Sequence, residues 1–147
     1  MGWSHHWERN TELPKEQFAE AVADCENVLQ TIDVSLGGFD GTGKPVFSEE
    51  HVVFNGTEGS GCEPFEIARV EFDRRGRDKV FSSCKTEQTP YDICVQVSLV
   101  ILKHHLADAI GVGSDGTNRD WEESRRICQE CLGYGMDFKL EEESDDA

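Results

Sequence analysis

Basic residues are scarce in this chain. Of its 147 residues, 14 are Lys or Arg and 30 are Asp or Glu, which gives a formal net charge of −16. So acidic a surface cannot neutralise many phosphates, which disfavours direct nucleic-acid binding and, for the same reason, docking on anionic lipid. The composition suits solubility, and it also permits a basic protein partner.

Long apolar runs are missing as well. The longest predominantly apolar run, Val97–Leu102, falls far short of the roughly 20 residues that a membrane-spanning helix needs. The segment Met1–Asn10 carries two tryptophans and two histidines rather than an apolar stretch, so it does not look like a signal peptide. We therefore expect a cytoplasmic protein with no membrane partner, whose six cysteines are thiols.

The first half of the chain shows two kinds of periodicity. Pro14–Ile32 carries apolar residues at helical spacing, which predicts an N-terminal helix. Residues 45–72 alternate short runs of β-branched and aromatic residues with glycine-rich turns, which predicts an antiparallel β-meander. Trp3–Trp7, ahead of the helix, is expected to form a short edge strand or a loosely held arm.

The second half predicts a β-α-β-α unit. We expect strands at Lys79–Cys84 and Ala109–Gly113, helices at Pro90–Leu106 and Arg119–Leu132, and a possible last strand at Tyr134–Leu140. The apolar residues of Pro90–Leu106 alternate as in a strand, but the segment is long for a strand. A helix that is apolar almost all round should be the most buried one.

Two strands joined by a helix should form a parallel pair in one sheet, so that the polar loops after them leave from the same carboxyl edge. Open α/β sheets tend to bind ligands at that edge. Taken together, the patterns predict one α+β domain over residues 1–140, built around the buried helix. A disordered acidic tail is expected over residues 141–147.

The loop after the first of these strands holds the best nucleophile candidate. Cys84 lies at the end of a strand, near a helix N-terminus and beside Lys85, and both neighbours favour the thiolate. Lys85 could instead hold an anionic group against the backbone N–H groups of the helix start.

Polar residues of both loops form the candidate ligand site. Several of them have an ordinary explanation as helix caps, and no histidine is obviously placed to complete a triad with Asp115. The candidate ligand-binding residues are Lys85, Thr86, Asp92, Ser114, Asp115 and Thr117.

Three motif fragments do not support a cofactor or a metal. Gly38–Lys44 matches G-x-x-x-x-G-K, but Pro45 stands where the magnesium ligand belongs. Gly111–Gly116 matches G-x-G-x-x-G, but too little chain follows to complete a dinucleotide fold. Cys128 and Cys131, at a helix C-terminus, are expected as inward-facing core thiols, with structural zinc as the alternative. We therefore predict no cofactor and no bound metal.

A set of short motifs carries a resemblance. It consists of Phe54-Asn55-Gly56, Cys62-Glu63-Pro64-Phe65, Cys84-Lys85-Thr86, Pro90-Tyr91-Asp92, Ser114-Asp115-Gly116 and Trp121. In these motifs the chain resembles a scattered group of short bacterial and phage proteins with no assigned activity. The resemblance implies a small α+β domain and carries over no chemistry.

No complete catalytic constellation is legible in the sequence. We therefore expect an acidic intracellular protein that binds a protein partner or a small anionic ligand without catalysis. The alternative is a small enzyme that uses Cys84 as nucleophile, with Lys85 and Asp115 in support.

Overall fold

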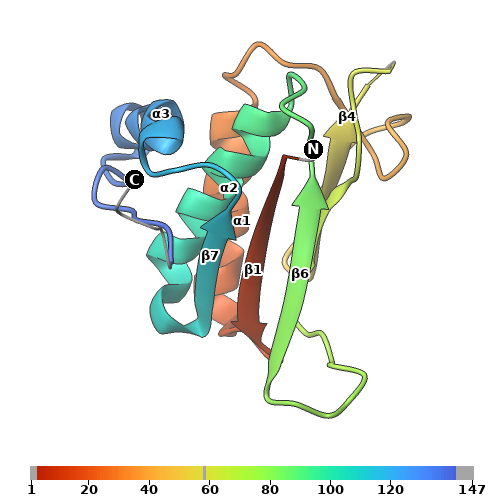
Figure 1. The fold of residues 1–147 in the computed structure, drawn as a ribbon, viewed down its shortest axis with the longest axis vertical. Coiled ribbons are helices and arrows are strands. Elements are labelled where there is room, and N and C mark those ends of the chain that lie inside the picture. Colours follow the sequence, from red (N-terminus) through yellow and green to blue (C-terminus); the bar gives the residue numbers. More distant parts are fainter. Residues whose placement is uncertain (1–2, 58, 142–147) are drawn as a thin grey trace.

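The structure is a computed structural model that describes residues 3–57 and 59–141. Within these residues it is an α+β fold with three α-helices and two antiparallel sheets (Figure 1), which confirms the fold class expected from the sequence. Apart from Glu141, the acidic tail expected at the end of the chain lies outside the described residues. The elements are β1 (Ser4–Asn10), α1 (Lys15–Leu29), β2 (Leu36–Gly37), β3 (Val46–Phe47), β4 (His51–Gly56), β5 (Phe65–Ala68), β6 (Lys79–Lys85), α2 (Asp92–Leu106), β7 (Ile110–Ser114) and α3 (Glu122–Leu132), with short 3-10 helices at Ala107–Ala109 and Arg119–Trp121.

The first sheet has the strand order β6-β1-β7, and β1 is antiparallel to both of its neighbours. β6 and β7 therefore run in the same direction (Figure 1), but β1 separates them, so they do not form the parallel pair expected from the sequence. The expectation of an edge strand or a loose arm at Trp3–Trp7 is wrong, because β1 is the central strand. Its buried face carries His5 and Arg9 beside Trp7. Because two of these three buried residues are polar, the sequence lacks the apolar alternation that would have predicted a buried strand.

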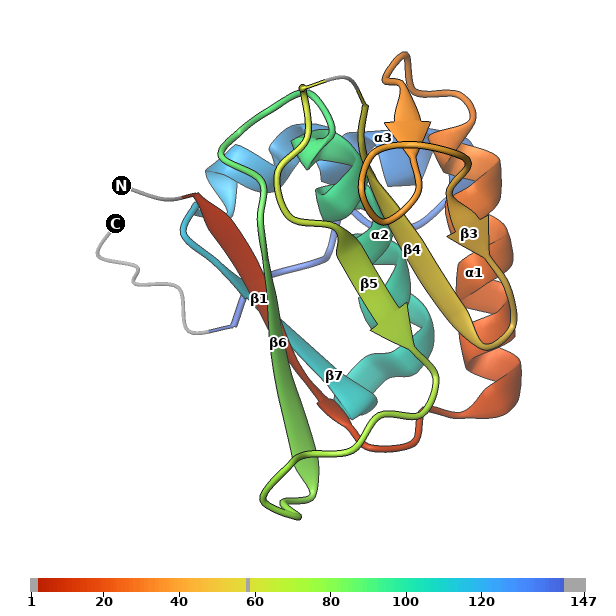
Figure 2. The same ribbon diagram turned by 90° about the vertical axis from the view of Figure 1, so that its right-hand side faces the viewer.

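The second sheet is built around β4, which pairs antiparallel with β2, β3 and β5. The meander stops at β5, because β6 joins the first sheet rather than continuing the second. Figure 2 shows β1, β6 and β7 together on one side of the molecule and β3, β4 and β5 on the other, with α1 and α2 behind them.

The helix predicted over Pro90–Leu106 is α2, and it is buried along almost its whole length. It packs against α1, α3 and β7, so apolar residues are needed on every side of it. It begins at Asp92 rather than at Pro90, and the turn before it is closed by a hydrogen bond from Asp92 N to Thr89 O of 2.9 Å.

The end of the chain differs from its prediction in two ways. No strand forms over Tyr134–Leu140; instead Glu141 N donates to Val112 O at 2.8 Å, which covers the outer edge of β7. In the C-x-x-C pair, Cys128 is buried but Cys131 is exposed, because only the first faces α2. Within the described ranges, no group of three or more His, Cys, Asp or Glu side chains is arranged to hold a metal ion.

Arg9 connects the two sheets. Its side chain is wholly buried, and its guanidinium donates to Ala68 O at 2.6 Å and Arg69 O at 2.8 Å while pairing with Glu71 at 3.1 Å. One hydrophobic core continues on both sides of this contact, and Trp7 of β1 packs on Phe65 of β5 with ring centroids 5.2 Å apart. In the part of the chain that the structure describes, no helix is long and apolar enough to cross a membrane.

Candidate binding site

The two polar loops leave from the same edge of the first sheet, as the sequence predicts. β6 ends at Lys85 and β7 at Ser114, on either side of the start of β1, where Ser4 is opposite Lys85 and His5 is opposite Ser114. Both arrowheads lie at this edge in Figure 1. The first turn of α2, with Asp92, lies against it.

His5 joins three of the candidate residues. It is wholly buried, with Nδ1 2.8 Å from Ser114 Oγ and Nε2 2.7 Å from Asp92 Oδ1. Asp92 Oδ1 also accepts from Thr86 Oγ1 at 2.5 Å, and Asp92 Oδ2 accepts from Gln96 Nε2 at 2.9 Å. Thr86, Asp92 and Ser114 therefore belong to one hydrogen-bond network, which we call the His5 network.

Asp92 is the charged centre of the His5 network. Burial by itself raises the pKa of this carboxyl, but hydrogen bonds from His5, Thr86 and Gln96 outweigh burial, so its pKa lies below its ordinary value. Asp92 is therefore ionised at neutral pH. A carboxylate can only accept, so His5 donates from Nε2; in the neutral ring, Nδ1 then accepts the hydroxyl proton of Ser114.

Ser114, His5 and Asp92 follow the order of a Ser-His-Asp triad, but the hydroxyl oxygen is not free to attack a substrate. Ser114 Oγ accepts from Gly116 N at 2.8 Å and from the indole of Trp121 at 3.3 Å. These two donors occupy both lone pairs of the oxygen. The network instead has the features of a structural connection between β1, β7 and α2.

Lys85 does not join the network. Its ammonium group lies 3.7 Å from Glu87, on a side chain about 44% exposed. Its backbone N donates to Glu63 Oε1 at 2.8 Å. Because a neighbouring carboxylate already balances this charge, the arrangement does not favour an anionic ligand at this edge.

Cys84 is wholly buried on the inner face of β6, where its thiol donates to Glu63 O at 3.4 Å. Burial raises the pKa of Cys84 to about 12, so the group is a neutral thiol at neutral pH. Neither its accessibility nor its protonation state suits a nucleophile.

The remaining candidates have structural partners. Asp115 N donates to Ser4 O at 2.9 Å, and Asp115 Oδ2 accepts from Ser4 N at the same distance, so this residue extends the pairing of β1 with β7. Thr117 N donates to Asp120 Oδ2 at 2.8 Å, which forms the cap at the start of the 3-10 turn before α3. Thr117 has the capping role recognised from the sequence, whereas the strand-pairing role of Asp115 was not predicted.

Beside the His5 network lies a cavity of about 290 Å³, which we call the edge pocket. Three carboxylates line it, and no lysine or arginine is among the lining residues. The lining comes from the start of the chain, from the loop before α2 and from the starts of α2 and α3. Its polar and aromatic lining residues include Trp3, Gln88, Asp92, Gln96, Asp120 and Glu123.

The edge pocket contains polar atoms without partners. Gln96 is only 4% exposed, and since its Nε2 donates to Asp92, its Oε1 is the end left without a partner in the described residues. Trp3 Nε1 is likewise buried and unpartnered. Nearby, Glu87 (φ +53°) and Gln88 (φ +57°) both adopt the left-handed conformation, which is uncommon for residues other than glycine.

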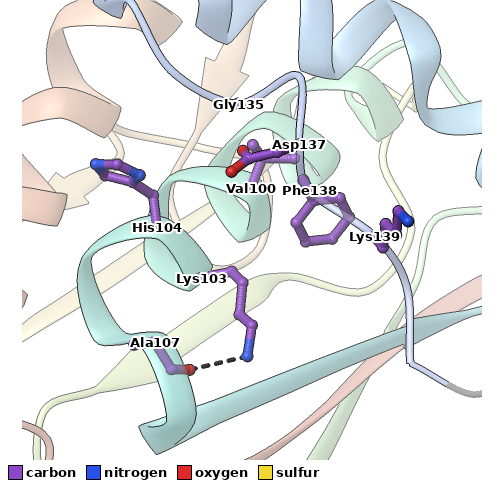
Figure 3. A pocket seen from close by; sticks show the side chains of 8 residues that line it. All are labelled: Val100, Lys103, His104, Ala107, Gly135, Asp137, Phe138 and Lys139. Atoms are coloured by element: carbon purple, nitrogen blue, oxygen red, sulfur yellow. Dashed lines mark hydrogen bonds between the residues drawn. The ribbon is translucent and has the colours of Figure 1, made fainter.

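A second cavity, of about 360 Å³, lies between α2 and the segment after α3, and we call it the C-terminal groove (Figure 3). Its lysine is already occupied, because Lys103 Nζ donates to Ala107 O at 2.9 Å and to Ile110 O at 2.8 Å. Figure 3 shows Lys139 pointing away from Lys103, so the two cations do not converge on one ligand.

Sequence reasoning found the right edge but missed His5, Trp3, Gln96 and Glu123. A partial signal for His5 was present, since it stands two residues before Trp7 and so shares a face with that tryptophan in an extended strand. For Gln96 the signal was a lone amide in an apolar helix, four residues after Asp92.

Comparison of the chain with protein-family models, with curated proteins and with solved structures finds no match. The resemblance to short bacterial and phage proteins therefore stays a prediction. Function has to be argued from the site alone.

Proposed function

We propose that this protein acts by binding a protein partner or a small ligand at the edge pocket, without catalysing a reaction. The observation that carries the proposal is the carbonyl oxygen of Gln96, which is buried in the pocket lining and has no partner. Leaving a buried acceptor unsatisfied costs about 1–3 kcal/mol, so such a group calls for an explanation. A ligand that donates to Gln96 Oε1 supplies one.

The alternative, an enzyme based on Cys84, has little support. Its thiol is buried and neutral, and Lys85 and Asp115 are each engaged with other groups. The Ser114 hydroxyl does not replace it, because two donors already occupy its oxygen. Binding needs none of these groups to react.

A cytoplasmic site of action in a phage or bacterial setting belongs to the same proposal. It is supported by the six cysteines, which are all free, since an oxidising compartment favours their pairing. The resemblance noted in the sequence motivates the phage or bacterial setting.

The proposal is tested with a thermal-shift screen of fragments that carry an ammonium, guanidinium, carboxylate or phosphate group. A ligand that binds only the folded state raises the melting temperature. We expect at least one class to raise the melting temperature of the wild type, and Gln96→Met to abolish that rise.

Gln17→Met is the matched control, because Gln17 is exposed on α1, away from the edge pocket. It should keep the full shift. If no class shifts the wild type, or if Gln96→Met retains the shift, the edge pocket is not the binding site.

A further inference from the structure

We infer that the group bound in the edge pocket is a guanidinium, presented by an arginine side chain of a protein partner. The inference rests on the proposed function, because it names the ligand of the same pocket. It is carried by the pocket's charge, by its unpartnered acceptor and by the aromatic ring at its rim.

The charge of the edge pocket favours a cationic ligand. The N-termini of α2 and α3 both contribute to this edge, and a helix N-terminus carries a partial positive charge of about half a unit, which favours anions. Asp92, Asp120 and Glu123 oppose this with three full negative charges around one cavity. The carboxylates therefore dominate the electrostatic potential in the pocket, and its net preference is for a positive group.

Two of these carboxylates are open to a ligand. Glu123 forms no hydrogen bond or ion pair with the described residues, and Asp120 uses Oδ2 for Thr117, which leaves its Oδ1. Asp92 has both oxygens engaged in the His5 network. Asp92 therefore supplies charge, whereas Asp120 and Glu123 supply contacts.

The arrangement of acceptors favours a guanidinium over an ammonium. The open acceptors come from different elements, Gln96 Oε1 from α2 and the carboxylates of Asp120 and Glu123 from the turn before α3 and from α3, and a planar guanidinium presents five N–H donors in a fixed fork that can satisfy several acceptors together. An ammonium is a compact and strongly hydrated point charge, which matches such a spread of acceptors less well.

Trp3 supplies an aromatic surface. Its ring meets His5 edge-on, at 6.2 Å and 82°, and it lies so close to Gly116 that a Cβ added there would be 2.8 Å from the indole. Gly116 therefore provides the room that the ring needs at the pocket rim. Arginine stacks on tryptophan faces more often than lysine does.

The size of the pocket suits a single side chain. Its volume of about 290 Å³ is at the lower end of the range of about 300–1,000 Å³ that is typical of small-molecule sites. With a net charge of −16, the chain also attracts a basic partner over a distance. A protein that exposes an arginine fits both observations.

The test uses four probes: L-argininamide, L-lysinamide, L-citrullinamide, which is neutral and nearly isosteric with the first, and the peptide acetyl-Gly-Arg-Gly-amide. Binding is followed by protection of tryptophan fluorescence from acrylamide. Trp7 and Trp121 are only 1% and 0% exposed, so quenching reports mainly on Trp3. We expect the peptide to bind most tightly, argininamide next, lysinamide more weakly, and citrullinamide not measurably.

Substitutions assign the binding to the pocket. Glu123→Gln should lower the affinity for the peptide about five- to tenfold, because it removes a charge-assisted hydrogen bond. Glu122→Gln removes the same charge from the neighbouring exposed position, which does not line the pocket, and should change the affinity less than about twofold.

Each other outcome overturns a defined part of the inference. Equal binding of lysinamide and argininamide removes the guanidinium preference, and a peptide no tighter than argininamide assigns the site to a free guanidine instead of a protein. If a fragment of another class binds in a Gln96-dependent way while the arginine probes do not, this inference fails but the proposed function stands. If nothing binds in a Gln96-dependent way, both fail.

Discussion

The edge pocket and the C-terminal groove are cavities of similar size, about 290 and 360 Å³. The first is lined by residues from the N-terminal part of α2 and the second by residues from its C-terminal part. In the groove, the half-buried Lys103 donates to two carbonyls, and the other charged or polar lining side chains, those of His104, Asp137 and Lys139, are exposed to solvent. Beside the groove, Tyr134 donates to Asp24 Oδ2 at 2.7 Å, which His105 also contacts at 2.8 Å. In the edge pocket, the amide oxygen of Gln96 is both buried and without a partner among the described residues.

This difference distinguishes polar groups that stabilise the fold from polar groups that can bind a ligand. Polar groups that satisfy one another hold segments of the chain together, whereas unpartnered groups in a lined cavity are available to a ligand. Substitutions near the groove, or in the His5 network under the pocket, should therefore cost stability. Substitution of Glu123, an open group outside that network, should cost binding and leave stability almost unchanged. Gln96 belongs to both sets, because its Nε2 donates to Asp92.

The largest expected effect concerns reactivity. Cys84 has its pKa raised by burial from the ordinary thiol value of 9.0 to about 12, so its thiolate fraction at neutral pH is about a thousandfold lower. Labelling of the native protein with a thiol reagent should therefore be fast at the exposed Cys62 and Cys131 and very slow at Cys84. Fast labelling of Cys84 would restore the enzyme alternative and break the comparison.

Asp92→Ala should have the largest effect on stability. It leaves His5, Thr86 and Gln96 without their common acceptor, and each buried donor left unsatisfied costs about 1–3 kcal/mol. Urea denaturation measures the loss, with Asp108→Ala at an exposed position as the control. A loss below about 1 kcal/mol would mean that the network does not hold the edge together.

The same carboxyl should make stability depend on pH. The pKa of Asp92 is lower in the folded chain than its ordinary value of 3.8, so its contribution is complete above that value and is lost as the pH falls through the folded pKa. Denaturation curves are measured between about pH 6 and about pH 2.5, a range that includes the ordinary pKa values of carboxyl groups. Over this range the wild type should lose more stability than Asp92→Asn does. Parallel losses in the two proteins would assign the acid sensitivity to other carboxyls.

Tyr134→Phe, a substitution beside the groove, should have an intermediate effect on stability. It removes one hydrogen bond to Asp24 while His105 remains in contact with that carboxylate, so we expect a loss of about 1 kcal/mol. Urea denaturation is again the measurement. No effect on the binding of the arginine peptide is expected, since Tyr134 does not line the edge pocket.

The smallest expected effect is that of Glu123→Gln on stability. The residue is exposed and has no partner within the described chain, so the free energy of unfolding should change by less than about 0.5 kcal/mol. Together with weaker peptide binding, this result would sharpen the comparison. A large loss of stability would show that Glu123 has a structural role after all.

The parts of the fold that depend on local pattern were predictable. The apolar stripe of α1 and the continuous apolar surface of α2 follow from spacing along the chain, and the common direction of β6 and β7 follows from the helix between them. β1 was not predictable in this way, because its pairing with Lys85 and Ser114 joins residues about eighty to one hundred and ten positions apart.

The residues of the site likewise fall into a group that local sequence patterns predict and a group that depends on long-range strand pairing. Thr86, Asp92 and Ser114 flank strand ends and a helix start, which local reasoning recognises. Their meeting point, His5, comes from the unpredicted central strand, and the contribution of Trp3 to the pocket depends on the same strand. What a residue contacts across the sheet cannot be deduced from its neighbours in sequence.

The central position of β1 also constrains the order of folding during synthesis. Residues 4–10 are synthesised before both of their neighbours, because β6 ends at Lys85 and β7 at Ser114. β1 can pair with β6 once the chain has been made as far as Lys85, but its other edge has no native partner until Ser114 has been made. The first sheet, and the ligand site at its edge, can therefore assemble only after both later strands have left the ribosome.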